Sequence, residues 1–165
     1  MGATKKIGNP NSQGALALDP IALLKALRPL QWVKNGLVFL PFVFAVDLAW
    51  STDDLGPVPE LLLKLVFVAL AFSALSSAIY LFNDLMDRSG DRLHPVKKNR
   101  PIASGKVGAP VAVSVMIVLA TAGLVVMVLV EPFLGLAGGL YAGINVGYSL
   151  GIKQVVLLDA FAVTS

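Results

Sequence analysis

Long apolar runs alternate with short charged stretches along this chain. Three runs, at 65–82, 107–130 and 132–152, contain no charged side chain and are bounded by charged residues. A helix needs about 20 apolar residues to cross about 30 Å of hydrocarbon. The pattern therefore predicts membrane spans at about 62–83, 107–130 and 132–152.

Two further apolar stretches are shorter. The run 36–46 contains Pro41, and because backbone in lipid must be hydrogen-bonded internally, it predicts a kinked helix over about 34–50. A fifth run begins at 154 and extends to Ser165. We expect residue 154 to begin another span.

The N-terminal residues differ from the rest of the chain. Residues 1–18 are rich in Gly, Asn, Ser and Lys and show no signal peptide, which predicts a disordered cytosolic tail. After it, Asp19 is a candidate N-cap with Pro20 at the first helical position. Apolar positions 21, 23, 24 and 27 then indicate a short interfacial helix or, equally well, a leader to the first span.

Composition narrows the fold class. The chain is 56% hydrophobic and 14% charged, and its mean hydropathy is +0.79. These values exclude an ordinary water-soluble core and favour an all-α polytopic transmembrane helical bundle, with residues 19–165 as a single transmembrane domain. The absence of cysteine from these 165 residues excludes disulfides and thiolate metal sites within them.

Charge is distributed unevenly between the connections. The net charge of +3 comes from basic residues beside apolar spans, which suits lipid headgroups or phosphorylated substrates and disfavours nucleic acid. Positive charges concentrate in the N-terminal segment and in the connection 84–106, whereas acids dominate the connection 47–60. The positive-inside rule therefore places the N-terminus and the 84–106 loop in the cytoplasm.

Acidic residues cluster at the cytoplasmic end of the predicted second span. On a continuous helix the side chains of Asn83, Asp84, Asp87 and Asp91 fall within an arc of about 100°. Carboxylates this close repel one another unless a cation lies between them, and Mg²⁺ prefers oxygen ligands. The spacing indicates a Mg²⁺ site or, with comparable weight, a solvated helix end whose acids pair with Arg88 and Arg92.

A basic, proline-containing stretch follows at 94–106. Pro95 and Pro101 interrupt regular helix, and Lys97 and Arg100 have the reach and charge to bind phosphate oxygens. Basic groups beside acids suit a diphosphate leaving group. Positive-inside topology alone explains the charge but not its alternation with prolines and acids.

These motifs resemble those of a known family. The sequence Asn83-Asp84-x-x-Asp87-x-x-x-Asp91, followed by the RPIASG stretch at 100–105, is similar to the first Asp-rich motif of the UbiA superfamily of intramembrane prenyltransferases. The stretches 27–35 and 94–97 look like the decaprenyl-phosphate phosphoribosyltransferase branch. Residues 148–153, with Asp159, are similar to the Tyr/Lys portion that precedes a second Asp-rich motif.

The resemblance implies a fold, an activity and a location. Members have about nine spans, so we expect this chain to be the N-terminal half of the fold and to be inactive alone. The implied reaction moves a 5-phosphoribosyl group from phosphoribosyl diphosphate (PRPP) to a polyprenyl (decaprenyl) phosphate, releases diphosphate and feeds cell-wall arabinan precursor synthesis. The implied location is the bacterial inner membrane, with the active site in the cytoplasmic loop 84–106.

The resemblance also implies roles for individual residues. The catalytic residues would be Asp84, Asp87, Asp91 and Lys34. The three aspartates would bind Mg²⁺, with Asn83 in the same shell. Four basic residues and one aromatic residue would contact substrate phosphates: Lys34, Lys97, Arg100, Lys153 and Tyr148. A lysine just inside an apolar run is costly without an anionic partner, although its side chain can also extend to the interface.

Other functions fit the same pattern. A relative could transfer a polyprenyl group to an aromatic quinone precursor, using the same acids to ionise a prenyl diphosphate. A non-catalytic membrane subunit in which the acids only bind cations is a third possibility, although the acids lie at a span boundary rather than mid-span. The sequence leaves homo-oligomerisation open.

Overall fold

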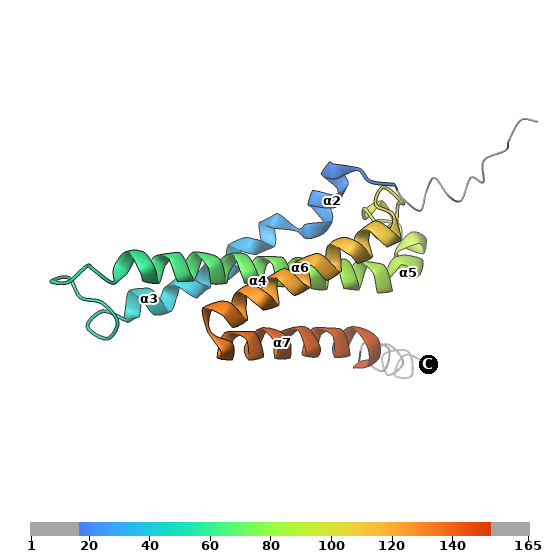
Figure 1. Cartoon of the computed structure of the whole chain (residues 1–165). Coiled ribbons are helices and arrows are strands. Elements are labelled where there is room, and N and C mark those ends of the chain that lie inside the picture. Colours follow the sequence, from blue (N-terminus) through green and yellow to red (C-terminus); the bar gives the residue numbers. More distant parts are fainter. Residues whose placement is uncertain (1–16, 153–165) are drawn as a thin grey trace, which may run out of the picture.

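The computed structural model describes residues 17–152. Within that range the chain forms helices and two isolated β-bridges, and no β-strand. The long helices lie side by side, with α5 and its connections at one end (Figure 1). The elements in chain order are α2 (Pro20–Leu27), η1 (Pro29–Phe39), α3 (Leu40–Phe44), α4 (Val58–Met86), α5 (Arg88–Leu93), η2 (Lys97–Asn99), α6 (Ala109–Val130), α7 (Pro132–Gly147) and η3 (Tyr148–Ile152). The expected all-α bundle is confirmed for this part of the chain.

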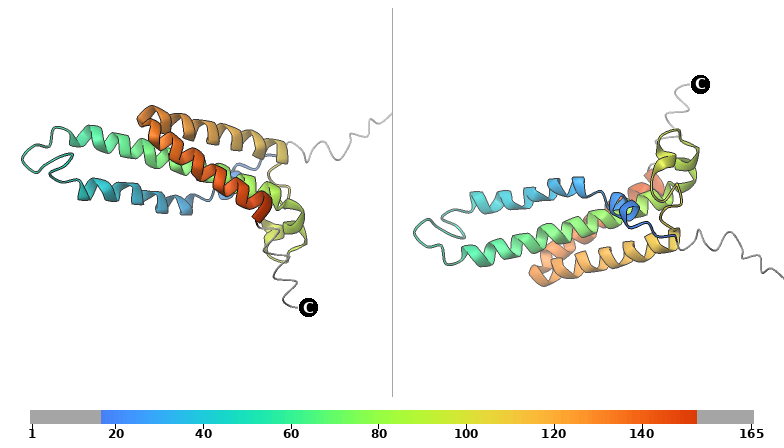
Figure 2. Two further views of the ribbon diagram at one scale, coloured as in Figure 1. Left: turned by 90° about the horizontal axis from the view of Figure 1, so that it is seen from below. Right: turned by 90° about the horizontal axis from the view of Figure 1, so that it is seen from above.

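Helices α4 and α6 form the centre of the bundle. They pack along each other, and α7 folds back beside α6, as the views from two sides show (Figure 2). Leu75 and Ile79 of α4 are buried against Met127 of α6. Both helices are long and apolar enough to cross a membrane.

The outward faces of the bundle are also apolar. Leu70 on α4 and Val118 and Leu129 on α6 are among many large apolar side chains that are more than half exposed. A soluble monomer rarely exposes so much contiguous apolar surface, whereas lipid accepts it. This surface fits the transmembrane bundle that composition predicts.

Close contact between the helices depends on glycines at two interfaces, that of α6 with α4 and that of α7 with α6. A Cβ atom on Gly123 would lie 2.8 Å from the carbonyl oxygen of Ala71, so only glycine permits this approach of α6 to α4. Gly135 and Gly138 are buried between α6 and α7, whereas a Cβ on Gly139 would meet no atom within 4 Å.

The N-terminal helix begins as the sequence predicts. The Asp19 carboxylate accepts hydrogen bonds from the backbone N–H groups of Ile21 (3.0 Å) and Ala22 (3.1 Å), which confirms the N-cap. Ala22 and Ala26 of α2 are buried against Leu81 of α4 and residues of the connection to α6. Of the predicted tail 1–18, only residues 17 and 18 are described.

The first apolar run forms a different structure from the kinked helix predicted at 34–50. A 3₁₀ helix (η1) spans Pro29–Phe39 and is followed directly by the short α3, which ends at Phe44. Beyond it the chain turns, with Asp47 at a positive φ of 65° and Phe42 stacked on Trp50 at 5.1 Å. The helical segment thus lies about five residues earlier than predicted, because Pro29 begins it and the turn stops it.

The remaining predicted spans agree with helices in place but not in every boundary. Helix α4 extends from 58 to 86, beyond the predicted 62–83, and α6 covers 109–130 of the predicted 107–130. The run 132–152 consists of α7 followed by a π-helical turn, η3. The span predicted from 154 lies outside the described residues.

Candidate functional site

The site lies where α4 passes into α5. Asp84 occupies the last turn of α4 and Asp91 lies in α5, and both are buried, at 2% and 3% exposure. Helical hydrogen bonding continues across the junction, from the Asp87 N–H to the Asn83 carbonyl (2.9 Å) and from the Asp91 N–H to the Asp87 carbonyl (2.8 Å). Asp84 and Asp91 are therefore two turns apart on one side of a nearly continuous helix.

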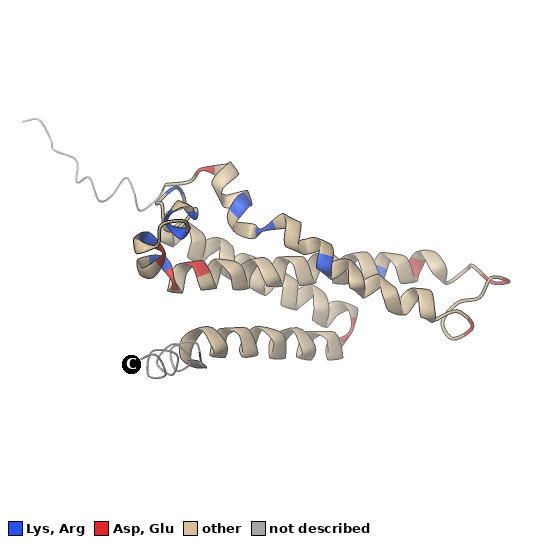
Figure 3. Ribbon diagram, turned by 180° about the vertical axis from the view of Figure 1, so that it is seen from behind, with Lys and Arg blue, Asp and Glu red and all other residues tan. Residues whose placement is uncertain are grey.

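Two arginines neutralise these carboxylates. Arg28 Nη2 lies 2.8 Å from Asp84 Oδ1, and Arg100 Nη1 lies 3.3 Å from the same oxygen and 2.9 Å from Asp91 Oδ2. The two arginine side chains are 34% and 30% exposed, so the ion pairs lie at the edge of the buried region. Acidic and basic residues gather at this end of the bundle (Figure 3).

Arg28 is a site residue that the sequence did not single out. It has a left-handed backbone conformation (φ 55°) between α2 and η1, and its guanidinium carbon lies 4.6 Å from the centre of the Tyr80 ring. A guanidinium over an aromatic face is stabilised by a cation–π interaction. The signal available in the sequence is a basic residue directly before Pro29, which by itself indicates only membrane topology.

The sequence leaves open that the acids pair with Arg88 and Arg92. In the structure Asp84 and Asp91 pair with Arg28 and Arg100 instead. Arg92 Nε donates instead to the carbonyl oxygen of Ala103 at 3.1 Å. Arg88 Nε is buried and has no hydrogen-bond partner within residues 17–152.

The other two predicted metal ligands have different surroundings. Asn83 Oδ1 accepts a hydrogen bond from the Ser149 hydroxyl, which ties η3 to the end of α4. Asp87 is half-buried and caps the C-terminus of α4. Nothing in the sequence singles out Ser149, since 66 residues separate it from its partner.

The basic loop folds back over the junction. Ile102 and Ala103 are buried, at 0% and 5% exposure, and anchor the loop beneath Arg100. His94 Nδ1 accepts hydrogen bonds from the backbone N–H groups of Val96 and Lys97, both at 3.2 Å, and so shapes the turn. Lys97 is exposed on η2 next to this turn.

Of the remaining predicted phosphate ligands, Lys34 and Tyr148 are not in this cluster. Lys34 is exposed on η1, whose neighbouring Asn35 bonds to Ser73 of α4 at 3.0 Å. At about 1.5 Å per residue, Ser73 lies roughly 16 Å along α4 from Asp84. Tyr148 is half-exposed in η3, and Lys153 lies outside the described residues.

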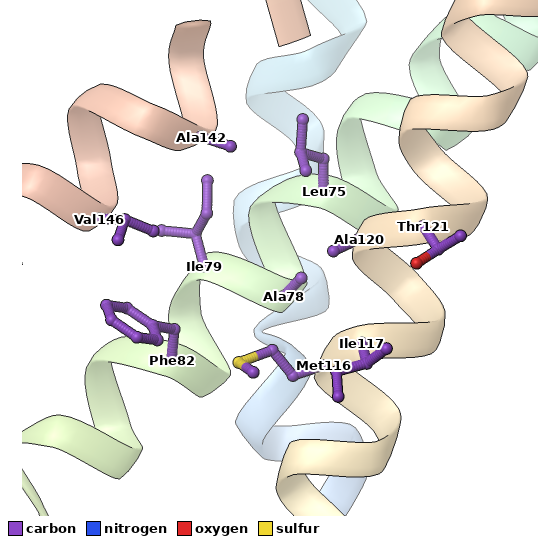
Figure 4. A pocket seen from close by; sticks show the side chains of 10 residues that line it. All are labelled: Leu75, Ala78, Ile79, Phe82, Met116, Ile117, Ala120, Thr121, Ala142 and Val146. Atoms are coloured by element: carbon purple, nitrogen blue, oxygen red, sulfur yellow. The ribbon is translucent and has the colours of Figure 1, made fainter. Parts of the chain in front are cut away.

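An apolar groove lies along another side of α4. It has a volume of about 260 Å³ and lies between α4, α6 and α7. Figure 4 shows Phe82, Ile79 and Leu75 lining it from α4, with Met116 and Val146 opposite. The last groove residue on α4, Phe82, lies two residues before Asp84, but at about 100° per residue the two side chains point to different sides of the helix, so the groove and the charged cluster share the end of α4 without sharing a residue.

The donor set is suited to a small divalent cation with an anionic ligand. Two carboxylates already share one cationic group, and Mg²⁺ typically takes one or two protein carboxylates together with phosphate oxygens and water. Within residues 17–152 no three acidic or histidine side chains are grouped closely enough to enclose an ion alone. The residues present therefore fit a cation completed by a phosphate ligand rather than an all-protein cage.

Comparison with known proteins gives a consistent family. The model of the "UbiA prenyltransferase family" matches residues 38–164. Two similar proteins are named decaprenyl-phosphate phosphoribosyltransferase: that of Mycobacterium tuberculosis is 35% identical over 143 residues, covering 87% of this chain and 46% of the relative, and that of Corynebacterium glutamicum is 36% identical over 146 residues, covering 87% and 42%. The nodulation protein NoeC of Azorhizobium caulinodans is 33% identical over 155 residues, covering 94% and 48%. The chain spans less than half the length of these relatives.

Proposed function

The chain belongs to the UbiA prenyltransferase family, and from that membership we propose that it is part of a membrane transferase acting on a polyprenyl phosphate. In this proposal the enzyme moves a 5-phosphoribosyl group from PRPP to the lipid phosphate and releases diphosphate. The product is a precursor for cell-wall arabinan. The names of the relatives in Mycobacterium tuberculosis and Corynebacterium glutamicum support this choice of donor and acceptor.

One observation carries the proposal: the helix that holds the paired acid–arginine cluster at its end, α4, also lines an apolar groove. The cluster of Asp84, Asp91, Arg28 and Arg100 supplies charges for a phosphorylated donor. The groove beginning at Phe82 supplies an apolar surface for an isoprenoid chain. In this proposal the isoprenoid chain lies along α4 and its phosphate reaches the end of the helix, where the charged cluster binds the diphosphate.

The chemistry demands little of the protein beyond positioning. An oxygen of the acceptor phosphate attacks C1 of the ribose, the bond from C1 to the diphosphate oxygen breaks, and the electron pair leaves with diphosphate. Because the acceptor is already an anion, no general base is required, and catalysis depends on orientation and on stabilising the departing charge. Lys97, which is exposed on η2, and Arg100 would bind that diphosphate from the loop.

Family members are generally Mg²⁺-dependent, and the same dependence is proposed here. Asp84, Asp87 and Asp91 would hold the ion, with Asn83 beside them, and the ion would neutralise charge on the leaving diphosphate. Lys34, Lys153 and Tyr148 are proposed to bind phosphate groups of the substrates from η1 and the C-terminal end of the chain. The catalytic loop 84–106 would lie on the cytoplasmic side of the inner membrane.

A transfer assay tests the proposal. The complete gene product that contains this chain is incubated in lipid with Mg²⁺, ribose-labelled PRPP and polyprenyl phosphate. We expect labelled lipid to form with Mg²⁺ and to be absent when the ion is chelated. A parallel incubation contains a labelled prenyl diphosphate and an aromatic acid instead. Product in that incubation, with no labelled lipid formed from PRPP, would overturn the proposal in favour of a quinone-type prenyltransferase.

A further inference from the structure

Arg100 lies where a cation between Asp84 and Asp91 would be expected. One of its nitrogens, Nη1, contacts oxygens of both carboxylates, at 3.3 and 2.9 Å. The two carboxylates are 3% and 4% exposed, so a positive group between them is strongly favoured. The protein thus supplies its own cation to this pair.

The charge balance of the cluster has a consequence for ligand binding. Asp84 and Asp91 carry two negative charges, and Arg28 and Arg100 carry two positive charges. Adding a bare divalent cation to these four groups would leave two positive charges in excess, of which the half-buried Asp87 carboxylate offsets at most one. Beside carboxylates that are 3% and 4% exposed, the remaining excess is unfavourable. A divalent cation that arrives with a diphosphate brings the compensating negative charge.

The two arginines are held differently. Arg28 makes one contact of 2.8 Å with Asp84, and its guanidinium is also stacked on Tyr80. Arg100 contacts both acids through a single nitrogen, and its 3.3 Å contact with Asp84 is longer than the 2.8 Å contact of Arg28. It also lies in the connection between η2 and α6 rather than in a helix. Arg100 is therefore the arginine that can exchange its carboxylate partners for phosphate oxygens, to which guanidinium groups bind well.

We propose that Arg100 occupies the cation position between Asp84 and Asp91 in the unliganded protein, so that the site takes up a divalent cation only together with a diphosphate. This inference rests on the proposed function, because it requires a diphosphate substrate. Diphosphate draws Arg100 away from the carboxylates, and their oxygens then become available. The ligand of the site is the metal–diphosphate complex rather than the free ion.

Mn²⁺ binding followed by electron paramagnetic resonance tests the proposal without turnover. The complete gene product in lipid nanodiscs is titrated with Mn²⁺ alone and with Mn²⁺ plus inorganic pyrophosphate, after correction for Mn²⁺ bound by free pyrophosphate. We expect pyrophosphate to strengthen Mn²⁺ binding to the wild-type protein by about tenfold or more, the factor for one charge-assisted contact. Arg100→Gln should bind Mn²⁺ alone about tenfold more tightly than wild type and gain less from pyrophosphate.

A matched control separates this effect from a general loss of positive charge. Lys98→Gln removes a charge from the same loop at an exposed position, and no acid pairs with Lys98 within residues 17–152. It should bind Mn²⁺ alone as the wild type does. If Arg100→Gln binds Mn²⁺ alone no better than wild type or Lys98→Gln, the proposal is overturned.

Hydrogen exchange on the unaltered protein gives a second measurement that does not depend on the folding of a variant. Backbone exchange in residues 94–106 should change with Mn²⁺ plus pyrophosphate and stay constant with Mn²⁺ alone. An equal change in hydrogen exchange with Mn²⁺ alone would overturn the proposal that Arg100 leaves the carboxylates only for a diphosphate. It would leave the proposed diphosphate site intact. Failure to bind Mn²⁺ even with pyrophosphate would overturn the proposed diphosphate site itself, and this inference with it.

Discussion

At the scale of single residues, the site depends on how one buried carboxylate is compensated. Both arginines contact the same oxygen of Asp84, Oδ1, from segments 72 residues apart in sequence. Leaving such a carboxylate unpaired costs far more than an exposed ion pair contributes. Arg28 is the more firmly held of the two partners, because it also stacks on Tyr80.

We predict that Arg28→Gln lowers the free energy of unfolding by about 1–3 kcal/mol, since Asp84 loses a charged hydrogen bond at a partly exposed site. Arg28→Lys should have an intermediate effect, because lysine keeps the charge but lacks the planar group that stacks on Tyr80. Denaturation in detergent measures both. Lys25→Gln, at an exposed position of the preceding helix α2, should change stability by no more than about 0.5 kcal/mol. Equal effects of Arg28→Gln and Lys25→Gln would contradict the assigned contact.

Sequence reasoning identifies only the local half of this site. Asp84, Asp91 and Arg100 lie within 17 residues of one another, so helical spacing and loop composition point to them. Arg28 and Ser149 are 56 and 66 residues from their partners in the site. Helical periodicity relates only residues a few positions apart, so it cannot predict these contacts. Lys34 stands out because it interrupts an apolar run, a feature that does not specify which residue lies opposite.

At the scale of the helices, the contact between α4 and α6 depends on Gly123. The carbonyl oxygen of Ala71 and the backbone nitrogen of Leu75 would both be within 3.3 Å of any Cβ atom at this position. Backbone atoms cannot move aside as a flexible side chain can. Close approach of helices through small residues is a common mode of packing in lipid.

Gly123→Ala should therefore lower the free energy of unfolding by about 1–3 kcal/mol through overpacking. Gly139→Ala is the matched control, since its Cβ would meet no atom within 4 Å and alanine favours helix. Both variants can be compared by thermal denaturation in the same detergent. A loss of stability in Gly139→Ala as large as in Gly123→Ala would contradict the assigned packing.

A second prediction concerns how η1 is held on α4. Trp32 Nε1 donates a hydrogen bond to Ser77 Oγ at 2.9 Å, beside the bond from Asn35 to Ser73. Trp32→Phe should weaken this attachment by about 0.5–1.5 kcal/mol and speed hydrogen exchange across residues 29–39. Trp50→Phe removes an indole bond to the Phe42 carbonyl instead and should leave η1 unchanged. Unaltered exchange in Trp32→Phe would show that η1 is held by other contacts.

Hydrophobic runs predict the long helices better than the short ones. Charged residues end the apolar runs clearly, so the positions of α4 and α6 follow from the sequence. The segment 29–44 forms 3₁₀ and short α structure because Pro29 begins it early and side-chain bonds to α4 hold it. Those tertiary contacts are invisible in a pattern of apolar positions.

At the scale of the whole molecule, the two ends of the bundle differ in charge. The end with α5 carries the basic loop and the site, whereas the opposite connection contains Asp47, Asp53 and Asp54 (Figure 3). The positive-inside rule then predicts that residues 88–106 face the cytoplasm. Orientation is therefore a property of the loops rather than of the apolar helices.

The lack of cysteine within this chain makes the predicted orientation easy to test. Thr52→Cys and Ser104→Cys each place one exposed thiol in opposite connections. In intact cells a membrane-impermeant maleimide should label the first variant, and it should label the second only after permeabilisation. Labelling of Ser104→Cys in intact cells would reverse the orientation.

The central claim is that the Asp84 cluster binds the diphosphate of the donor, and transfer by a single variant tests it most directly. Asp84→Asn and, as control, Asp53→Asn in the opposite loop are each made in the complete gene product and assayed with ribose-labelled PRPP and polyprenyl phosphate. We predict that Asp84→Asn lowers turnover by about a hundredfold or more, with membrane insertion unchanged, and that Asp53→Asn keeps wild-type turnover. Wild-type turnover in Asp84→Asn would contradict the claim.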